Sequence, residues 1–343
     1  MMIKLLLRGL KVGLFVNVFL TLTLIFYTVF IENWLSKPLS GSPQTLVKLG
    51  TVIDYHRLFD ADPPSMRLRP SWLKIQDNFS YFIIEYQLRF DYYLPSPRLL
   101  NWCRASKCFA HRIAYDDSRK KLFKLFTLDD WFTNFYLSTR NTKGDAQALA
   151  SFLRSLSPGS TVIISEPIVT LSSPPVFRQF SEWVLFLRSQ HPHLKFEIGL
   201  QIHLQWIDAY WLRSSWVIPA IARFSKTSGV PWGLSEFSIY DQIWKRRLRD
   251  DNFRDRPFYR IEQLVPRRLR RAIVLHSSYV IHRTAVENGA IRFTEWGNSQ
   301  RTAWFVAEID SAYDSNYELF TLSGTPTPLW WAGLRGFRDA NLQ

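Results

Sequence analysis

The chain has 343 residues, with 43 Lys and Arg against 29 Asp and Glu, so its formal net charge is +14. A hydrophobic content of 47% with 16% aromatic residues excludes a disordered chain, and two cysteines exclude a disulfide scaffold or a four-cysteine zinc site. The basic excess predicts an anionic partner, but it does not distinguish nucleic acid from lipid head groups or an acidic polymer.

The N-terminus carries a candidate membrane helix. Residues 12–31 read VGLFVNVFLTLTLIFYTVFI without a charge, and a bilayer-spanning helix needs about 20 such residues. Lys4, Arg8 and Lys11 precede them, which predicts a cytoplasmic N-terminus and places the rest of the chain outside the cytoplasm. We expect residues 1–34 to form an uncleaved, single-pass signal anchor. A cleaved signal peptide is the alternative, although the apolar stretch is long for one and no small-x-small site follows it.

A linker and one large domain follow the apolar stretch. Residues 35–45 (LSKPLSGSPQT) are rich in Pro, Ser and Gly and indicate a linker. Residues 46–343 are then expected to form a globular domain outside the cytoplasm. Cys103 and Cys108 lie in this domain, where a disulfide and two free thiols both remain open.

Short apolar runs alternate with helical stretches along this domain, which predicts a parallel sheet covered by helices. A domain of this length fits a (β/α)8 barrel, although only seven strands stand out. An open doubly wound sheet would often carry a glycine-rich phosphate loop after its first strand, and Gly50 is followed instead by TVIDYH. The expected strands are 46–54, 81–90, 107–115, 160–168, 194–203, 230–238 and 290–297, and the expected helices are 145–156, 176–190, 209–227 and 257–288.

Polar and aromatic residues recur at or near the carboxyl ends of these strands, where barrel enzymes keep their active sites. Each alone has an ordinary explanation as a solvated Glu, a structural His or a core Trp. Their shared position at one end of successive strands is what indicates a site. They are Glu85, His111, Glu166, Gln201, His203, Glu236 and Trp296.

Eight segments in chain order resemble motifs of the glycoside hydrolase family 10 xylanases. IGLQIHL (198–204) is similar to that family's Ile-Gly-x-Gln-x-His, and GVPWGLSEFS (229–238) resembles the strand that ends in Thr-Glu-Leu-Asp. The other segments are LGTVIDYHRLF (49–59), EYQLRF (85–90), AHRIAYD (110–116), ISEPIV (164–169), FTEWGNSQRTAW (293–304) and YELFTLSGTPTPLWWAGLRGF (317–337). The resemblance implies a (β/α)8 barrel.

It also implies retaining cleavage of a β-1,4-linked polysaccharide such as xylan, for which two carboxyl groups lie about 5–5.5 Å apart. Glu236 matches the nucleophile, with Gln201 and His203 beside it. The resemblance further implies that sugar hydroxyls contact Glu85, Arg89 and His111, and that Trp296 and Trp304 form aromatic walls.

The acid/base position departs from the family pattern. The family places this residue at the end of the fourth strand, in Trp-Asp-Val-Val-Asn-Glu-Ala. Here the closest segment is LDDWFTNFYL (128–137), in which Trp131 and Asn134 are one residue too close. That alignment puts Phe135, which cannot transfer a proton, at the acid/base position.

Three carboxylates remain candidates for the acid. Glu166 precedes a proline as in related glycosidases, but counting strands back from Glu236 places it on the fifth strand, and Asp129 and Asp130 lie nearer the fourth. Two functions therefore stay open: a glycoside hydrolase, and a catalytically inactive barrel that binds glycans or serves as an interaction subunit of a membrane complex. A structural subunit of a larger membrane assembly is a third.

Other chemistries have little support. No His, Cys and carboxylate cluster has the spacing of metal ligands, so we expect no metal and no cofactor. No G-x-S-x-G occurs, so a Ser-His-Asp triad is not expected either. Residues 245–271 hold 11 basic and four acidic residues. They indicate either self-neutralised helix faces or a surface for anionic lipid, acidic polysaccharide or a protein partner. Nucleic acid is not expected, because this segment should lie outside the cytoplasm.

Overall fold

A computed structural model gives the fold of the chain. The ranges that it describes are 2–39, 48–54, 81–85, 108–110, 125–129, 131–133, 143–206, 210–240, 264–295 and 325–341.

The centre of the molecule is one sheet of eight strands in the order β3-β2-β1-β8-β7-β6-β5-β4. Every pair that the structure describes is parallel. The pairing of β1 with β8 brings the first and last strands together, which is the connection that turns a parallel series into a barrel. The strands are β1 Lys48–Asp54, β2 Tyr81–Glu85, β3 Cys108–Ala110, β4 Leu125–Asp129, β5 Thr161–Pro167, β6 Lys195–Gln205, β7 Trp232–Tyr240 and β8 Arg292–Glu295.

The predicted (β/α)8 architecture is confirmed, and the strand missing from the sequence prediction is β4. Its residues LFTLD follow directly on a lysine-rich stretch and are too few to show a clear period. β4 pairs with β5 from Leu125 opposite Thr161 to Asp129 opposite Ser165. Residues of β3 and β4 come within 8 Å of each other, yet among the described residues no ladder joins them. Within the described residues, the sheet is therefore not closed between β3 and β4.

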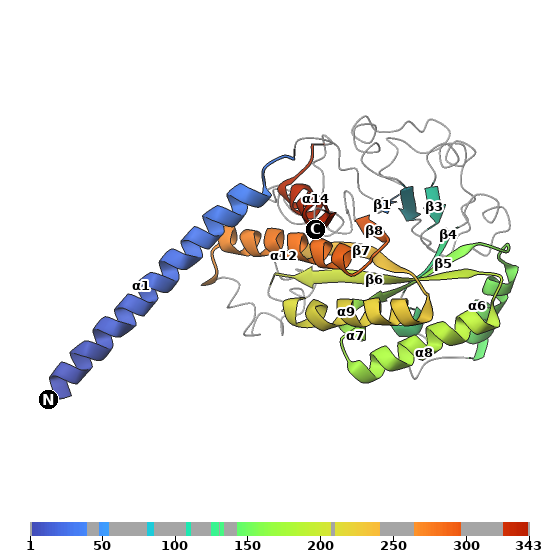
Figure 1. Cartoon of the computed structure of the whole chain (residues 1–343), viewed down its shortest axis with the longest axis horizontal. Helices are drawn as coiled ribbons and strands as arrows, with labels where there is room; N and C mark the ends of the chain where they lie inside the picture. Colours follow the sequence, from blue (N-terminus) through green and yellow to red (C-terminus); the bar gives the residue numbers. More distant parts are fainter. Residues whose placement is uncertain are drawn as a thin grey trace, which may run out of the picture.

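Helices cover the outer face of the sheet, with α6, α8 and α9 along one side and α12 and α14 toward the N-terminal helix (Figure 1). The expected helix 257–288 is observed as α12 from Arg267 onward; residues 257–263 lie outside the described ranges. Pro266 precedes α12 in an extended conformation, which suits a helix start. The helices are α6 Lys143–Ser155, α7 Ile168–Leu171, α8 Pro174–Gln190, α9 Tyr210–Ser228, α12 Arg267–Glu287 and α14 Pro328–Asn341.

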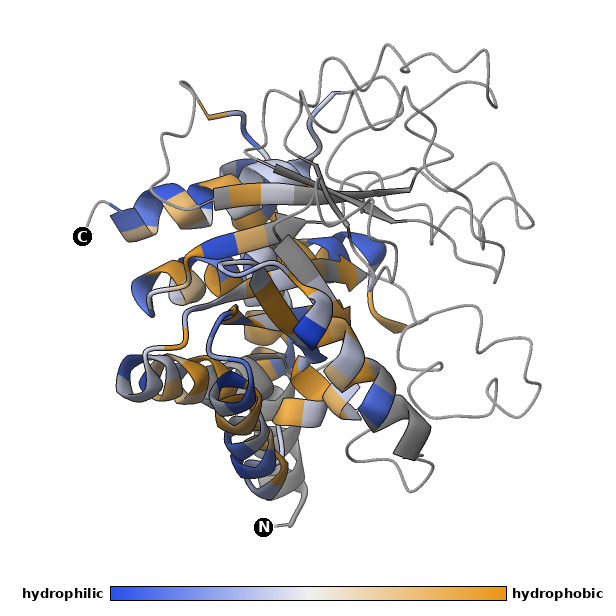
Figure 2. Ribbon diagram, turned by 90° about the vertical axis from the view of Figure 1, so that its right-hand side faces the viewer, coloured by the Kyte–Doolittle hydropathy of each residue, from blue (hydrophilic) through white to orange (hydrophobic). Residues whose placement is uncertain are grey.

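The strands present two different faces. The outer face is apolar and joins the helices in one hydrophobic core, which Figure 2 shows in orange on the strands and helices. Ile198, Leu200 and Ile202 alternate along β6 on this face and are almost fully buried. The inner face carries more polar groups: near the amino ends of its strands, Arg292 binds Glu197 through two bonds of 2.9 and 3.1 Å.

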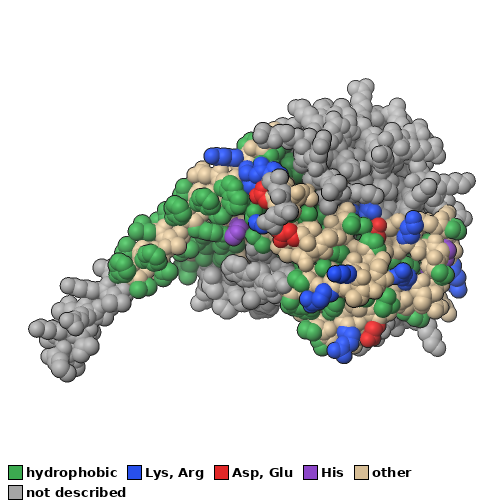
Figure 3. Space-filling model, viewed as in Figure 1, with side chains coloured by type: hydrophobic (Ala, Val, Ile, Leu, Met, Phe, Trp, Pro, Cys, Tyr) green, Lys and Arg blue, Asp and Glu red, His purple; other side chains and the backbone are tan. Residues whose placement is uncertain are grey.

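Helix α1 (Met2–Leu35) extends away from the barrel (Figure 1). Its Phe15–Leu35 part is long and apolar enough to cross a membrane, by length and composition. Hydrophobic side chains cover the described surface of this protruding helix (Figure 3). Phe15 and Phe26 are each about 70% exposed. An apolar surface of this size is uncommon on a protein that stays in water.

The last turns of α1 pack against α12. Ile31 and Leu35 are buried in the barrel's hydrophobic core. The rings of Trp34 and Tyr279 meet edge to face with centroids 5.0 Å apart. The last turns of α1 therefore contribute side chains to the hydrophobic core of the barrel.

Candidate functional site

Glu236 lies in the carboxyl-terminal half of β7, opposite Gln201 of β6. A register shift after Leu200 inserts Ser235 as an extra residue at this point. Glu236 and Gln201 are each only 4% exposed. The bulge thus sets two buried polar residues side by side on neighbouring strands.

The side-chain contacts show which face this pair occupies. Phe237, the next residue of β7, packs its ring on His282 of α12 with centroids 4.4 Å apart, so it points outward to the helices. Because successive strand residues point to opposite faces, Glu236 points to the inner face of the barrel.

A polar network lies beside Glu236 on the inner face. The hydroxyls of Ser165 on β5 and Ser235 on β7 are hydrogen-bonded at 2.6 Å. The side-chain amide of Gln201 donates to the Ser165 hydroxyl at 3.1 Å. Gly199 leaves room for this contact, since a Cβ there would lie 2.5 Å from the Cβ of Ser235. Neither serine can be singled out from the sequence, because a single Ser in an apolar strand forms no recognisable pattern.

Glu166 has a different position. It follows Ser165 on β5, so its side chain points to the outer face. Its carboxylate is fully buried and accepts three hydrogen bonds, from the backbone N–H of Phe132 at 2.6 Å and from the N–H and hydroxyl of Thr133 at 3.2 and 2.6 Å. The Phe132 ring packs on Phe180 of α8, with centroids 5.3 Å apart.

This placement does not fit the role that the sequence suggested for Glu166. A retaining pair needs both carboxyl groups in one cleft, about 5–5.5 Å apart. Glu166 and Glu236 lie on opposite faces of the same sheet, and Glu166 holds the turn that follows β4. Its position on the fifth strand, by contrast, is as predicted.

Asp129 is the candidate acid that the strand register favours. It is the last residue of β4 and pairs with Ser165, whose side chain is on the inner face. The register therefore sets the backbone of Asp129 beside that of Ser165, at the carboxyl end of β4. Asp130 lies outside the described residues.

The other predicted residues are only partly placed. Glu85 ends β2 opposite Asp54 of β1, and His203 pairs with Ser238, so both backbones lie toward the carboxyl ends of their strands. The other residues predicted to bind sugar lie outside the described residues: Arg89, His111, Trp296 and Trp304. Cys103 also lies outside them, so a disulfide with Cys108 stays a prediction.

Metal ligands are not gathered in the part of the chain that the structure describes, where no three His, Cys, Asp or Glu side chains come together. His191 and His193 face each other with ring centroids 6.0 Å apart. Burial lowers the pKa of His191, and the neighbouring His193 and Arg154 lower it further. This pair lies in the turn before β6, away from Glu236.

The sequence matches no protein-family model and no curated protein. Solved structures do match. Native xylanase 10B from Thermotoga maritima is 11% identical with a TM-score of 0.55, over 87% of this chain and 97% of that one. A family 10 glycoside hydrolase from Paenibacillus barcinonensis is 12% identical with a TM-score of 0.52, over 86% and 96%.

The structure of a mutant protein in complex with xylotriose is 10% identical with a TM-score of 0.58, over 87% of this chain and 99% of that one. The chain has the fold of the family 10 xylanases. At these identities the likeness concerns the fold alone, and it assigns no function to the residues of this chain.

Proposed function

We propose that this protein binds a β-1,4-linked polysaccharide of the xylan type at the carboxyl end of its barrel, and that Glu236 is the nucleophile of retaining hydrolysis. The observation that carries the proposal is the buried Glu236 beside Gln201 on the inner face of a xylanase-like barrel. Two of the similar structures are complexes, with xylotriose and with xylopentaose, which favours an oligosaccharide as ligand.

In this mechanism Glu236 attacks the anomeric carbon, and the sugar–oxygen bond to the leaving chain breaks as a glycosyl ester forms. A second carboxyl group gives its proton to the leaving oxygen and later takes one from the water that hydrolyses the ester. We assign this group to Asp129, and the pairing of its backbone with that of Ser165 at the carboxyl end of β4 supports this choice. Gln201 and the two serines beside it would hold Glu236 in position.

The test is release of reducing sugar from xylan by the purified full-length protein. Glu236→Gln should abolish it, and Asp129→Asn should lower the rate by ~10²–10⁴, the usual contribution of general acid/base catalysis. Glu182→Gln, an exposed carboxylate on α8, is the matched control and should keep full activity. Equal rates for wild type and Glu236→Gln would exclude Glu236 as nucleophile.

A second function has one specific observation in its favour. The carboxylate that most resembled an acid, Glu166, is engaged on the outer face, and Asp129 is one methylene shorter than the Glu of the family pattern. A barrel without an acid would bind glycans, or act as an interaction subunit, without cleaving them. Calorimetric binding of xylooligosaccharides that is unchanged in Glu236→Gln, with no product formed, would establish this alternative.

We also propose that α1 anchors the barrel to a membrane as an uncleaved, single-pass helix, with the barrel outside the cytoplasm. The burial of Ile31 and Leu35 in the core supports an uncleaved helix, since cleavage after the apolar stretch would remove them. The basic residues before the stretch support the orientation. Resistance to carbonate extraction and accessibility of the barrel to external protease should both be observed, and extraction by carbonate would overturn the anchor.

A further inference from the structure

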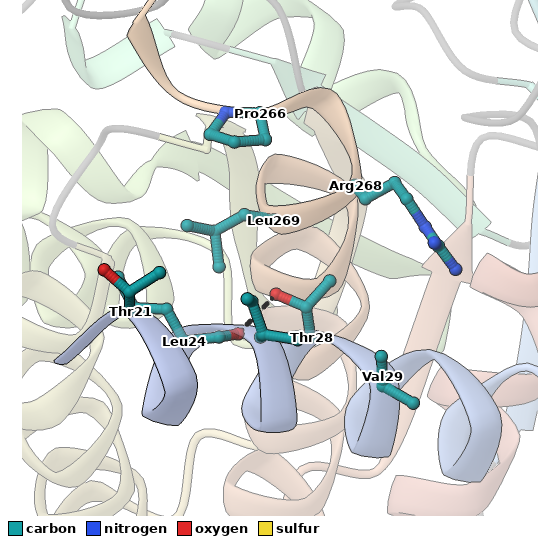
Figure 4. A pocket seen from close by; sticks show the side chains of 8 residues that line it. Thr21, Leu24, Thr28, Val29, Pro266, Arg268 and Leu269 are labelled. Atoms are coloured by element: carbon teal, nitrogen blue, oxygen red, sulfur yellow. Dashed lines mark hydrogen bonds between the residues drawn. The ribbon is translucent and has the colours of Figure 1, made fainter. Parts of the chain in front are cut away.

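An apolar groove of about 300 Å³ lies where α1 meets the start of α12 (Figure 4). The two helices line it from opposite sides, and Thr21 and Val29 lie toward its two ends along α1. Its lining residues are Thr21, Leu24, Ile25, Thr28 and Val29 of α1 with Pro266, Arg268 and Leu269.

We propose that this groove binds an acyl chain of an anionic phospholipid, and that Arg268 binds the phosphate of the same lipid. The inference rests on the proposed membrane anchoring of α1. It gives the anchor a specific lipid and does not depend on the chemistry of the barrel.

The lining favours hydrocarbon over a polar ligand. The Thr21 hydroxyl donates to the Asn17 carbonyl at 2.8 Å, and the Thr28 hydroxyl donates to the Leu24 carbonyl at 2.7 Å. Both hydroxyl protons are therefore used within α1, and the surface left to a ligand is mainly carbon. A polar molecule would lose its water in this groove without gaining hydrogen bonds.

The position along α1 matches one leaflet of a membrane. Glu32 follows the uncharged stretch, and its carboxylate accepts a hydrogen bond from Arg268 at 3.0 Å. From Glu32 back to Thr21 a helix rises about 16 Å, close to half of the ~30 Å hydrocarbon core. With the N-terminus in the cytoplasm, Arg268 lies at the outer head-group level and the groove runs inward beside the acyl chains.

The charge at this end of the groove suits an anionic head group. Arg267, Arg268, Arg270 and Arg271 fall in the first two turns of α12, whose first turn has no acidic residue. A phosphate near the positive end of this helix dipole is favourable, and the nearby basic residues strengthen the attraction. The Arg268 side chain is 76% exposed although it binds Glu32, so its guanidinium can reach a phosphate as well.

The experiment uses the full-length protein reconstituted into vesicles of phosphatidylcholine with phosphatidylglycerol. After extraction into detergent, native mass spectrometry counts the lipid that each chain retains. Wild type should retain phosphatidylglycerol in preference to phosphatidylcholine. Arg268→Gln should reduce that retention about fivefold, the effect expected of one basic residue at an anionic surface. Leu269→Trp, which fills the groove, should reduce it as well.

Two controls separate the groove from general effects. Arg283→Gln removes an arginine that pairs with Glu287 further along α12, and Leu185→Trp enlarges an exposed leucine on α8. Both should retain lipid as wild type does. Equal retention of the two lipids, unchanged retention in Leu269→Trp, or displacement by soluble glycerol phosphate would each overturn the lipid site.

Membrane anchoring by α1 is tested in a separate experiment, by flotation of the wild-type protein with vesicles. Flotation without selective retention would contradict the groove proposal alone. Failure to float would contradict the proposed anchor, and the lipid site with it.

Discussion

Two glutamates are buried on opposite faces of the same sheet, and their surroundings differ. Glu166 on the outer face accepts three hydrogen bonds from the turn after β4, so its carboxylate serves the fold. Glu236 on the inner face stands beside Gln201 near the carboxyl ends of the strands. Both are buried to 4% exposure or less, so burial alone does not separate a structural carboxylate from a candidate nucleophile. The face of the sheet to which each side chain points is what separates them.

The largest loss of stability is expected on the inner face near the amino ends of the strands. Arg292 and Glu197 are about 10% and 13% exposed and bind through two hydrogen bonds. Arg292→Leu should lower the free energy of unfolding by about 3–5 kcal/mol, because it leaves Glu197 charged, buried and without this partner. Urea denaturation measures the change. A loss below about 1 kcal/mol would show that this end of the barrel is open to water.

Glu166→Ala should have the next largest effect, a loss of about 2–3 kcal/mol, because it leaves two backbone N–H groups and a hydroxyl without their shared acceptor. The same denaturation experiment on Glu236→Ala provides the comparison. Functional carboxylates are often less favourable for stability than structural ones, so Glu236→Ala should cost less than Glu166→Ala if Glu236 is the nucleophile proposed above. Equal losses in the two variants would remove the distinction between the faces.

Every described strand except β4 could be predicted from the sequence, but the face of the sheet to which a given side chain points could not. Glu236 and Gln201 stand out in the sequence because their segments resemble known motifs and come at the ends of long apolar runs. Glu166 was misassigned, because a Glu before a Pro at a strand end looks the same whichever way it points. Its direction depends on the contact of Ser165 with Ser235, 70 positions away. β4 was missed because its five residues are held in the sheet by pairing with β5 and show no pattern of their own.

The hydrogen bond between Ser165 and Ser235 allows a further test of the inner face. Ser165→Ala and Ser235→Ala should each cost about 1 kcal/mol, and the double variant should cost less than the sum, because the two hydroxyls bind each other. A double-mutant cycle by urea denaturation measures the coupling. If the network positions Glu236, Ser165→Ala should also lower kcat on xylan more than it changes KM. If Ser165→Ala lowers stability but leaves the kinetics normal, the serines stabilise the fold and do not position Glu236.

The smallest expected effect belongs to the outer layer, where α1 packs on α12. Burial lowers the pKa of His276, and the Tyr27 hydroxyl is hydrogen-bonded to its Nδ1 at 2.8 Å. The packed state thus disfavours the protonated imidazole, which an unfolded chain would form below about pH 6.5. Stability should therefore be greatest above that pH and fall modestly as the pH is lowered through it, because the unfolded state then binds more protons. Thermal unfolding between neutral and mildly acidic pH measures this slope, and His276→Gln should flatten it while leaving the contribution of the inner-face carboxylates unchanged. A slope that persists in His276→Gln would place the titrating group elsewhere, and the inner face would be the first region to test.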